Sequence, residues 1–450
     1  MYRLNVYDAT QKRLKIIFDY FDYVYVSFSG GKDSGVLLNL CIEYIRKYAP
    51  GRKLGVFHID YEIQYQQTTE YVKRTLSKNQ DILEVFHCCV PFKVTTCTSM
   101  FQRYWRPWES SHQELWARDM PQNCLTQDDF EFYTEELWDY DFQKLFIKWL
   151  RKKTKSRHIC CLVGIRTQES FNRWRSIHSD KNYKRLLNYK WTHKTGWHEY
   201  NAYPIFDWNT SDIWVANGYF NWDYNHLYDL YYQAGIPLAR QRVASPFISE
   251  AISTLAIYKT IDPYTWAKMI GRVNGVGCAG LYGNSSVMGW RKITCPSGFS
   301  WKHYMEFLLE TLPEEIRNNY IEKLNVSIKF WREKGGCLSE KTIEKLRKAG
   351  IAITVEETSV YHTNKKTVRM EYLDTIDIPE FREIPSYKRM CICIMKNDHT
   401  CKYIRNTNVY PDTLVYPVPL TCAIILSYET AACCIESSHH IIYQSICIGC

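Results

Sequence analysis

The sequence predicts an α/β fold in which a parallel sheet is flanked by helices. Within the first 90 residues, short runs rich in β-branched and aromatic side chains alternate with amphipathic patterns of helical period. This alternation is typical of parallel sheets, because each return to the sheet needs a crossover segment, usually a helix. The expected strands are 23–28, 54–59 and 82–88, with another at 158–163, and the expected helices are 8–22, 34–48 and 68–76.

Length and composition indicate a folded chain of more than one domain. The 450 residues are 46% hydrophobic and 23% charged, and a net charge of +9 favours anionic partners such as nucleotides or nucleic acid. The first residues lack the charged-then-apolar pattern of a secretory signal, and no run approaches the ~20 apolar residues of a membrane helix. We therefore expect a cytoplasmic protein without membrane contact, whose eighteen cysteines are mostly reduced thiols.

Charge and composition divide the chain into regions. Between Glu109 and Gln143 ten acidic residues accompany one basic residue, whereas 151–194 carries thirteen lysines and arginines against two acids. We expect the acidic part to belong to a solvated helical insertion at about 100–150. The predicted regions are an α/β domain at 1–245, a helical and glycine-rich region at 246–335, a small C-terminal α+β region at 336–403, and an atypical cysteine-rich tail at 404–450.

A glycine-containing turn directly follows the first expected strand and opens the next helix. Glycines there let the backbone approach an anion closely, and the helix N-terminus adds about half a positive charge. A lysine supplies a mobile full charge, and two serine hydroxyls can donate to phosphate oxygens. The alternative is a tight turn whose aspartate and serine only cap the helix. We predict a phosphate-binding loop formed by Ser29, Gly30, Gly31, Lys32, Asp33 and Ser34.

The spacing of this loop differs from GxxxxGK[ST], so cleavage of a γ-phosphate is not expected. The segment SFSGGKDS resembles instead the PP-loop of the ATP-pyrophosphatase superfamily. The resemblance implies an adenine nucleotide α-hydrolase-like, Rossmann-like fold that binds ATP, which is split between its α- and β-phosphates, or a related adenylyl nucleotide. Asp60 ends the second strand, at the edge where ligands lie in open α/β sheets, so we expect it beside the nucleotide. A turn cap is its alternative role.

A second motif follows the strand at 158–163. If Thr167 begins a helix, Ser170 and Arg173 share one face, and two guanidinium groups near a helix start can clamp phosphate or sulfate. A surface helix with ion pairs is the alternative. The segment GIRTQESFNR is similar to the G-x-R-x-x-E-S-x-x-R segment of phosphoadenosine phosphosulfate (PAPS) reductase-like proteins. This resemblance adds Gly164, Arg166, Glu169 and Arg173 to the nucleotide-binding residues.

Further segments support and limit this resemblance. Residues 203–214 resemble the P-I-x-x-W-x-x-x-D-V-W block of the same family, so the three blocks span about 20–245 in the family's order. The C-terminus does not match the catalytic Glu-Cys-Gly-x-His segment of PAPS reductases. Chain length, the insertion and residues 241–247 resemble a phage- and prophage-associated subgroup that includes the immunoglobulin-binding regulator A. That resemblance implies transcription regulation, often beside a ParB-like partner.

A group of cysteines near residue 400 is a candidate zinc site. Three thiolates and one imidazole within eleven residues could complete a tetrahedral zinc shell, although the spacing C-x-C-x5-H-x-C is not a common zinc pattern. Unpaired cysteines in a core are the alternative. The candidate ligands are Cys391, Cys393, His399 and Cys401.

Three functions follow from these patterns. The first is a nucleotide-binding protein that holds ATP or a PAPS-like nucleotide for adenylyl transfer or α–β phosphate cleavage, with magnesium neutralising the pyrophosphate. No nucleophile or general base can be assigned, so whether the chain turns a substrate over is left open. The second is a transcriptional co-regulator that acts with a ParB-like partner or on nucleic acid. The third is a thiol-dependent sulfonucleotide reductase.

Overall fold

A six-stranded sheet organises the N-terminal half of the computed structural model, which describes residues 5–178, 184–238, 241–249, 251–289, 292–356 and 365–404. The strand order is β3-β2-β1-β6-β8-β7, and every neighbouring pair is parallel except the edge pair β7 and β8. The predicted α/β fold is therefore confirmed. The strands are β1 Tyr23–Ser27, β2 Leu54–Ile59, β3 Leu83–Cys88, β6 Ile159–Val163, β7 Thr192–Gly196 and β8 Glu199–Ala202.

The two faces of the sheet bury different residues because side chains alternate along a strand. In β1, Val24 and Val26 belong to the core that contains Leu37. Tyr25 faces the opposite core, where the Phe57 and Phe146 rings stack with their centroids 4.0 Å apart. The helices that accompany the sheet are α1 Val6–Tyr20, α2 Lys32–Tyr48, α3 Gln66–Ser77, α4 Asp139–Lys153, α5 Phe171–His178, α6 Thr210–Tyr219 and α7 Leu227–Gln233.

The elements expected in the first 90 residues are confirmed to within two residues at each end, whereas the helical insertion is wrong over most of its length. Residues 100–138 form half of a hairpin, short 3-10 turns and irregular backbone, and regular helix begins only at Asp139. Bridges from Cys88 to Leu125 and from Lys93 to Trp138 hold this segment along the end of the sheet. The hairpin is β4 Val94–Ser99 with β5 Gln102–Trp105.

The region after residue 245 packs onto the first domain. Phe247 and Met288 share a core with Tyr65 and Val94, so this region completes the N-terminal body. A helix forms within the glycine-rich stretch of this region, and Gly275 precedes that helix with φ of 79°. A Cβ there would lie 2.3 Å from the Thr98 carbonyl oxygen, so only glycine allows this contact. The helices are α8 Tyr258–Ile261, α9 Pro263–Arg272 and α10 Val276–Tyr282.

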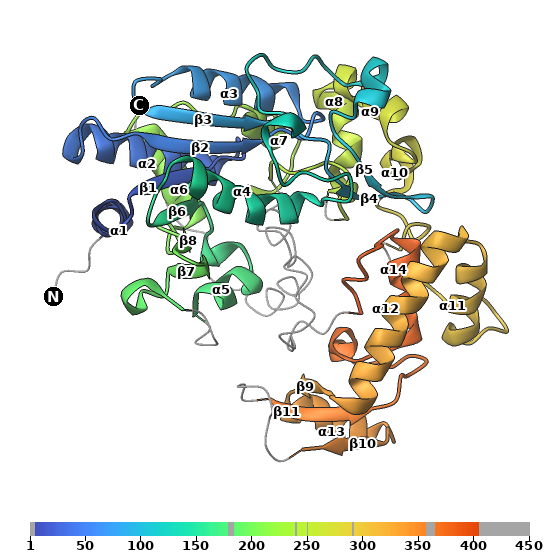
Figure 1. Cartoon of the computed structure of the whole chain (residues 1–450). Helices are drawn as coiled ribbons and strands as arrows, with labels where there is room; N and C mark the ends of the chain where they lie inside the picture. Colours follow the sequence, from blue (N-terminus) through green and yellow to red (C-terminus); the bar gives the residue numbers. More distant parts are fainter. Residues whose placement is uncertain are drawn as a thin grey trace, which may run out of the picture.

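A C-terminal body of helices and a small antiparallel sheet, ordered β10-β11-β9, is drawn in orange and red in Figure 1. Ser339 caps a helix and accepts a hydrogen bond from the Thr342 amide. The predicted cysteine-rich tail lies outside the described residues from 405 onward. The elements are α11 Trp301–Glu310, α12 Glu314–Glu333, β9 Gly336–Leu338, α13 Glu340–Lys348, β10 Ile353–Val355, β11 Lys366–Met370 and α14 Tyr387–Met395.

Within the described ranges, no helix combines the length and the apolar character that crossing a bilayer requires.

The aromatic core beneath β1 and β2 gives a test of the fold. We expect Phe146→Ala to lower the free energy of unfolding by about 3–5 kcal/mol, because a fully buried ring is replaced by a cavity. Val215→Ala, at a position that is 66% exposed, should change it by less than ~0.5 kcal/mol. Urea denaturation followed by circular dichroism measures both, and equal shifts would contradict the packing described here.

Candidate functional site

The predicted phosphate loop occupies the turn between β1 and α2. Gly30 has φ of 74°, and a Cβ there would lie 2.8 Å from Val72 Cγ2, so both conformation and space require glycine. The Ser29 and Ser34 hydroxyl oxygens lie 3.1 Å apart, and Ser34 Oγ donates to the Gly31 carbonyl at 3.1 Å. Side chains of the loop therefore hold its shape.

Residues distant in sequence fasten this loop from the side. Asn225 Nδ2 donates to the Gly30 carbonyl and to Thr68 Oγ1, both at 2.9 Å. The Lys32 amide donates to the Tyr228 hydroxyl oxygen at 3.1 Å. Sequence reasoning did not assign Asn225 or Thr68 to the site, because a contact across 157 residues leaves no local pattern.

Lys32 and Asp33 bring opposite charges to the start of α2. Lys32 Nζ lies 3.2 Å from Asp33 Oδ2 and 5.3 Å from the centre of the Tyr228 ring. Arg166 Nε donates to Asp33 Oδ1 at 2.6 Å. Burial alone would raise the pKa of Asp33, but the positive charges of Lys32 and Arg166 hold it below its ordinary value. Asp33 is therefore a carboxylate paired on both oxygens.

The second motif lies directly against this loop, as expected from its place after the neighbouring strand β6. A Cβ on Gly164 would lie 3.0 Å from the Asp33 carbonyl carbon, so the glycine permits the close approach of the two turns. Arg166 is 1% exposed, and its Nη2 atom lies 3.5 Å from Glu169 Oε1. Glu169 also pairs with Arg173. The structure thus brings Arg166, Glu169 and Arg173 together with Asp33.

The local structure of the second motif differs from the expectation. A 3-10 turn spans Thr167–Glu169, and α5 begins only at Phe171. Ser170 has extended backbone, and its hydroxyl oxygen accepts a hydrogen bond from the Arg173 amide at 3.2 Å. Ser170 therefore occupies the N-cap position of α5. The serine preference for this position could have located the helix start. Arg173 nevertheless reaches Glu169, as an ion pair over four residues.

Asp60 follows β2 as predicted, but its hydrogen bonds are made with residues outside the phosphate loop. Asp60 Oδ1 accepts from the Glu62 amide at 3.0 Å and from Arg118, and Oδ2 lies 2.8 Å from His87 Nε2. Burial would raise the pKa of this carboxyl, and the positive charge of Arg118 with the His87 hydrogen bond holds it well below its ordinary value. Contact of Asp60 with a nucleotide remains a prediction.

A small cavity of about 70 Å³ opens beside the loop, at the carboxyl ends of β1 and β2. Its polar groups include Asp139, whose Oδ2 accepts from the Tyr61 hydroxyl at 3.1 Å. Burial raises the pKa of Asp139 to about 7. Lining residues are Ser27, Phe28, Ser29, Phe57, Ile59, Tyr61, Gln64, Val94, Thr95, Asp139, Gln143, Val243, Ala244, Ser245 and Ile248.

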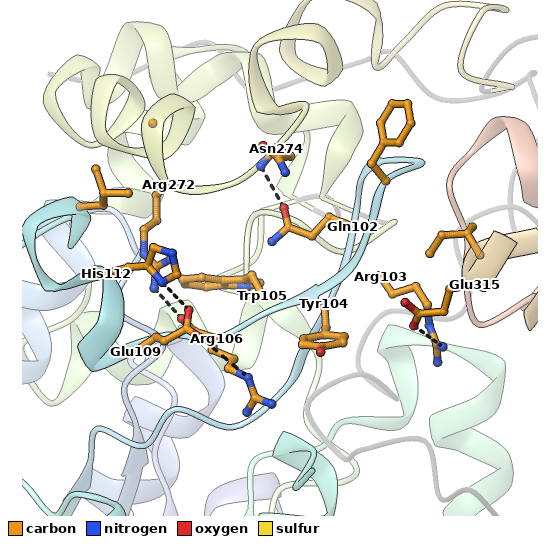
Figure 2. Close-up of a pocket in the computed structure, with 14 residues that line it drawn as sticks. Gln102, Arg103, Tyr104, Trp105, Arg106, Glu109, His112, Arg272, Asn274 and Glu315 are labelled. Carbon is orange, nitrogen blue, oxygen red and sulfur yellow. Dashed lines mark hydrogen bonds and ion pairs between the residues drawn. The ribbon is translucent and has the colours of Figure 1, made fainter. Parts of the chain in front are cut away.

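A larger cavity of about 490 Å³ lies elsewhere, between the β4-β5 hairpin, α9 and the start of α12 (Figure 2). None of its lining residues belongs to the two predicted motifs. Its arginines have carboxylate neighbours: Arg103 lies 3.6 Å from Glu315, and Arg106 lies 4.0 Å from Glu109. Because these charges balance one another, the cavity offers less attraction to an anion than the loop does.

The four predicted zinc ligands are buried in the C-terminal body but do not converge. Cys391 Sγ donates to the Trp301 carbonyl at 3.5 Å, whereas Cys393 hydrogen-bonds with Cys401. His399 Nε2 instead lies 3.1 Å from the Ser99 carbonyl. Residues two apart on a helix such as α14 point about 200° apart, which explains the divergence of the first two cysteines. The structure thus gives the zinc expectation no common ligand position.

Comparison with known proteins identifies two domains in the chain. Residues 23–235 match the phosphoadenosine phosphosulfate reductase domain, and residues 235–409 match a domain of unknown function, DUF3440. The uncharacterized protein YbdN of Escherichia coli is 32% identical over 410 residues, which cover 89% of this chain and 90% of that protein.

Solved structures resemble the N-terminal part weakly. A PAPS reductase from Candida auris, in a phosphate complex, is 15% identical with a TM-score of 0.28, and the match covers 49% of this chain and 84% of that one. The Candida glabrata FMN adenylyltransferase in complex with ATP is 15% identical with a TM-score of 0.30, covering 50% and 57%. At such scores the fold assignment rests on the sheet and on the domain match.

The domain match and the sheet agree on one assignment. Both motifs lie in the residues matched by the reductase domain, at the carboxyl ends of adjacent central strands. The similarity to YbdN extends through both domains. The chain therefore belongs to the family of YbdN, and its match to the PAPS reductase domain is followed by the match to DUF3440.

Proposed function

We propose that the turn from Ser29 to Ser34 binds the polyphosphate of an adenine nucleotide, either ATP or a PAPS-like nucleotide. The observation that carries this proposal is the concentration of buried positive charge beside the turn. In the ion pairs of the described residues, three buried cations share two carboxylates, and a bound polyphosphate would give these cations further anionic partners. The cations are Lys32, Arg166 and Arg173, and the carboxylates are Asp33 and Glu169.

The adjoining cavity supports a place for the base. It is lined by apolar side chains such as Ile59, and Gln64, Gln143 and Asp139 add groups that can hydrogen-bond to a purine edge. Its volume of about 70 Å³ is smaller than an adenosine, so binding requires side chains to move. The segment after α7 contributes four further lining residues: Val243, Ala244, Ser245 and Ile248.

Magnesium fits this site as a partner of the nucleotide. Once a phosphate takes over the contact with Lys32, Asp33 Oδ2 can face the ion, and the two serines offer hydroxyl oxygens. Such a set suits an ion that keeps most of its ligands from phosphate and water. When bound, magnesium would neutralise the pyrophosphate, while Lys32 and Arg166 position the phosphates.

The reaction that we propose is adenylyl transfer or cleavage between the α- and β-phosphates. Cations at the loop can stabilise negative charge that develops on the leaving pyrophosphate.

Nucleotide affinity tests the binding site. We expect Lys32→Ala to weaken binding of ATP or PAPS at least tenfold, because a charge-assisted contact contributes about 1.5–3 kcal/mol. Lys47→Ala, at an exposed position near the end of the same helix, should leave affinity unchanged. Isothermal titration calorimetry with magnesium measures both, and equal affinities would refute the assignment.

Isotope exchange tests the chemistry separately. We expect labelled pyrophosphate to enter ATP in the presence of magnesium and an acceptor, and Lys32→Ala to abolish this exchange. Release of ADP instead of AMP would contradict α–β cleavage. The Lys47→Ala variant again serves as the control.

The buried carboxyl of Asp139 gives a pH test of the cavity. Its pKa of about 7 exceeds the ~3.9 of an unfolded aspartate, so the folded chain binds the proton more tightly. The stability from this group is fully present below pH ~4, falls as the pH rises from about 4 to 7, and is lost above. Asp139→Asn should therefore raise the melting temperature at pH 8 more than at pH 5. Asp141→Asn, at a more exposed position on the same helix, is the control. Equal gains in the melting temperature of Asp139→Asn at both pH values would contradict the burial of Asp139.

The regulatory hypothesis concerns a different surface. The basic block at 151–194 includes Lys152 and Lys153, both exposed on α4. A co-regulator acting on nucleic acid through this block would bind DNA with an affinity that falls as salt rises. A ParB-like partner would instead copurify or bind in a pull-down with the full chain.

A further inference from the structure

Three metal-ligating side chains meet at the ends of two adjacent strands. His58 of β2 and His87 of β3 are direct neighbours in the parallel register. Asp60 lies two residues after His58, so it projects from the same face of the extended chain. One ligand atom from each of these residues lies within 4.8 Å of the others, the one such group among the described residues.

Hydrogen bonds indicate which atoms of this group are available to bind an ion. His58 Nδ1 lies 2.8 Å from the Phe28 carbonyl oxygen, which can only accept, so this nitrogen carries the proton. The Nε2 atom of a neutral ring then has a free lone pair. Metal-bound histidines typically have such a carbonyl partner on the second nitrogen, which orients the ring.

The carboxylate is oriented in the same way. Asp60 Oδ1 is held by Arg118 and by the Glu62 amide at 3.0 Å, whereas Oδ2 faces His87 Nε2 at 2.8 Å. An ion would replace the proton that now joins these two atoms. Nitrogen and oxygen ligands about 2.0–2.2 Å from zinc stand roughly 3.4 Å apart, so small side-chain rotations suffice.

Two thiols border the group. Cys89, two residues after His87, hydrogen-bonds with Cys124. Backbone bonds between Cys89 and Leu125, at 2.8 Å, and between Leu125 and His87, at 2.7 Å, hold Cys124 beside β3. A sulfur ligand would favour zinc over magnesium, and a thiolate would offset the charge of Arg118.

We propose that His58 Nε2, His87 Nε2 and Asp60 Oδ2 bind a divalent transition-metal ion of the zinc class, and that the Cys124 thiol, which lies outside this group of three, moves in as the fourth ligand. On binding, His87 ligates as a neutral imidazole: its Nε2 proton moves through solvent to Nδ1, or goes to solvent if both ring nitrogens were protonated, and the Cys124 thiol releases its proton to solvent. The ion would join β2, β3 and the insertion. Because His58 also contacts the residue before Ser29, the site adjoins the PP-loop, but the proposal does not depend on nucleotide binding.

Metal titration of the full chain tests the proposal. After removal of metals by a chelator, the wild type should bind one equivalent of Zn²⁺ in competition with a chromophoric chelator. His58→Asn and His87→Asn should each weaken binding at least 100-fold, whereas His226→Asn, at an exposed histidine, should not. Less than half an equivalent bound by the wild type, or equal affinities in His58→Asn and His226→Asn, would overturn the proposal.

Two further measurements locate the ion. Cys393→Ser should retain wild-type affinity, and a loss there would place the ion in the C-terminal body and overturn the proposal. X-ray absorption of the zinc-loaded wild type needs no variant, so it stays decisive if the histidine variants fail to fold. A shell dominated by nitrogen and oxygen supports the proposal, and a shell of sulfur alone overturns it. With Co²⁺, Cys124→Ser should remove the sulfur charge-transfer band, and a band that persists would exclude Cys124 as the fourth ligand.

Discussion

The ion pair between Arg166 and Asp33 is the contact on which the arrangement of the site depends. Arg166 lies in the turn after β6 and Asp33 in the first turn of α2, so the pair joins the ends of two adjacent strands. Both charges are largely removed from water, and removing one partner of such a pair costs about 3–5 kcal/mol. The close approach of the two turns at Gly164 makes the pair possible. Glu169 gives Arg166 a second carboxylate partner.

The fold and the two motifs could be predicted because their signals are local. A strand such as 54–59 and the glycines of the loop are read from adjacent residues, and the two motifs follow strands that turn out to be neighbours. The supports of the loop could not be predicted in the same way. Asn225 and Thr68 act through contacts that arise only when the turn before α7 meets the start of α3. Likewise, the pairing of His58 with His87 depends on strand register, which the sequence does not specify.

The errors have physical causes as well. Acidic composition predicted a solvated helix at 100–150, but Phe130 and Leu137 are buried in the main core, and bridges to the sheet end replace helical hydrogen bonds. The zinc site predicted at 391–401 assumed a loop, in which residues close in sequence can converge on one ion. In a helix, Cys391 and Cys393 turn to different sides. Composition and spacing alone therefore did not determine the geometry in either region.

The first core does not stop where the two matched domains meet. The reductase match ends at residue 235, yet Phe247, Leu255, Met269 and Ala279 belong to the same apolar cluster as Phe57 and Phe146. A chain cut at the domain boundary would expose this surface to water and leave the opposing half without its cover. The two matched domains thus share one folding unit over this stretch, and a chain that keeps the first half stable has to include the first part of the second domain.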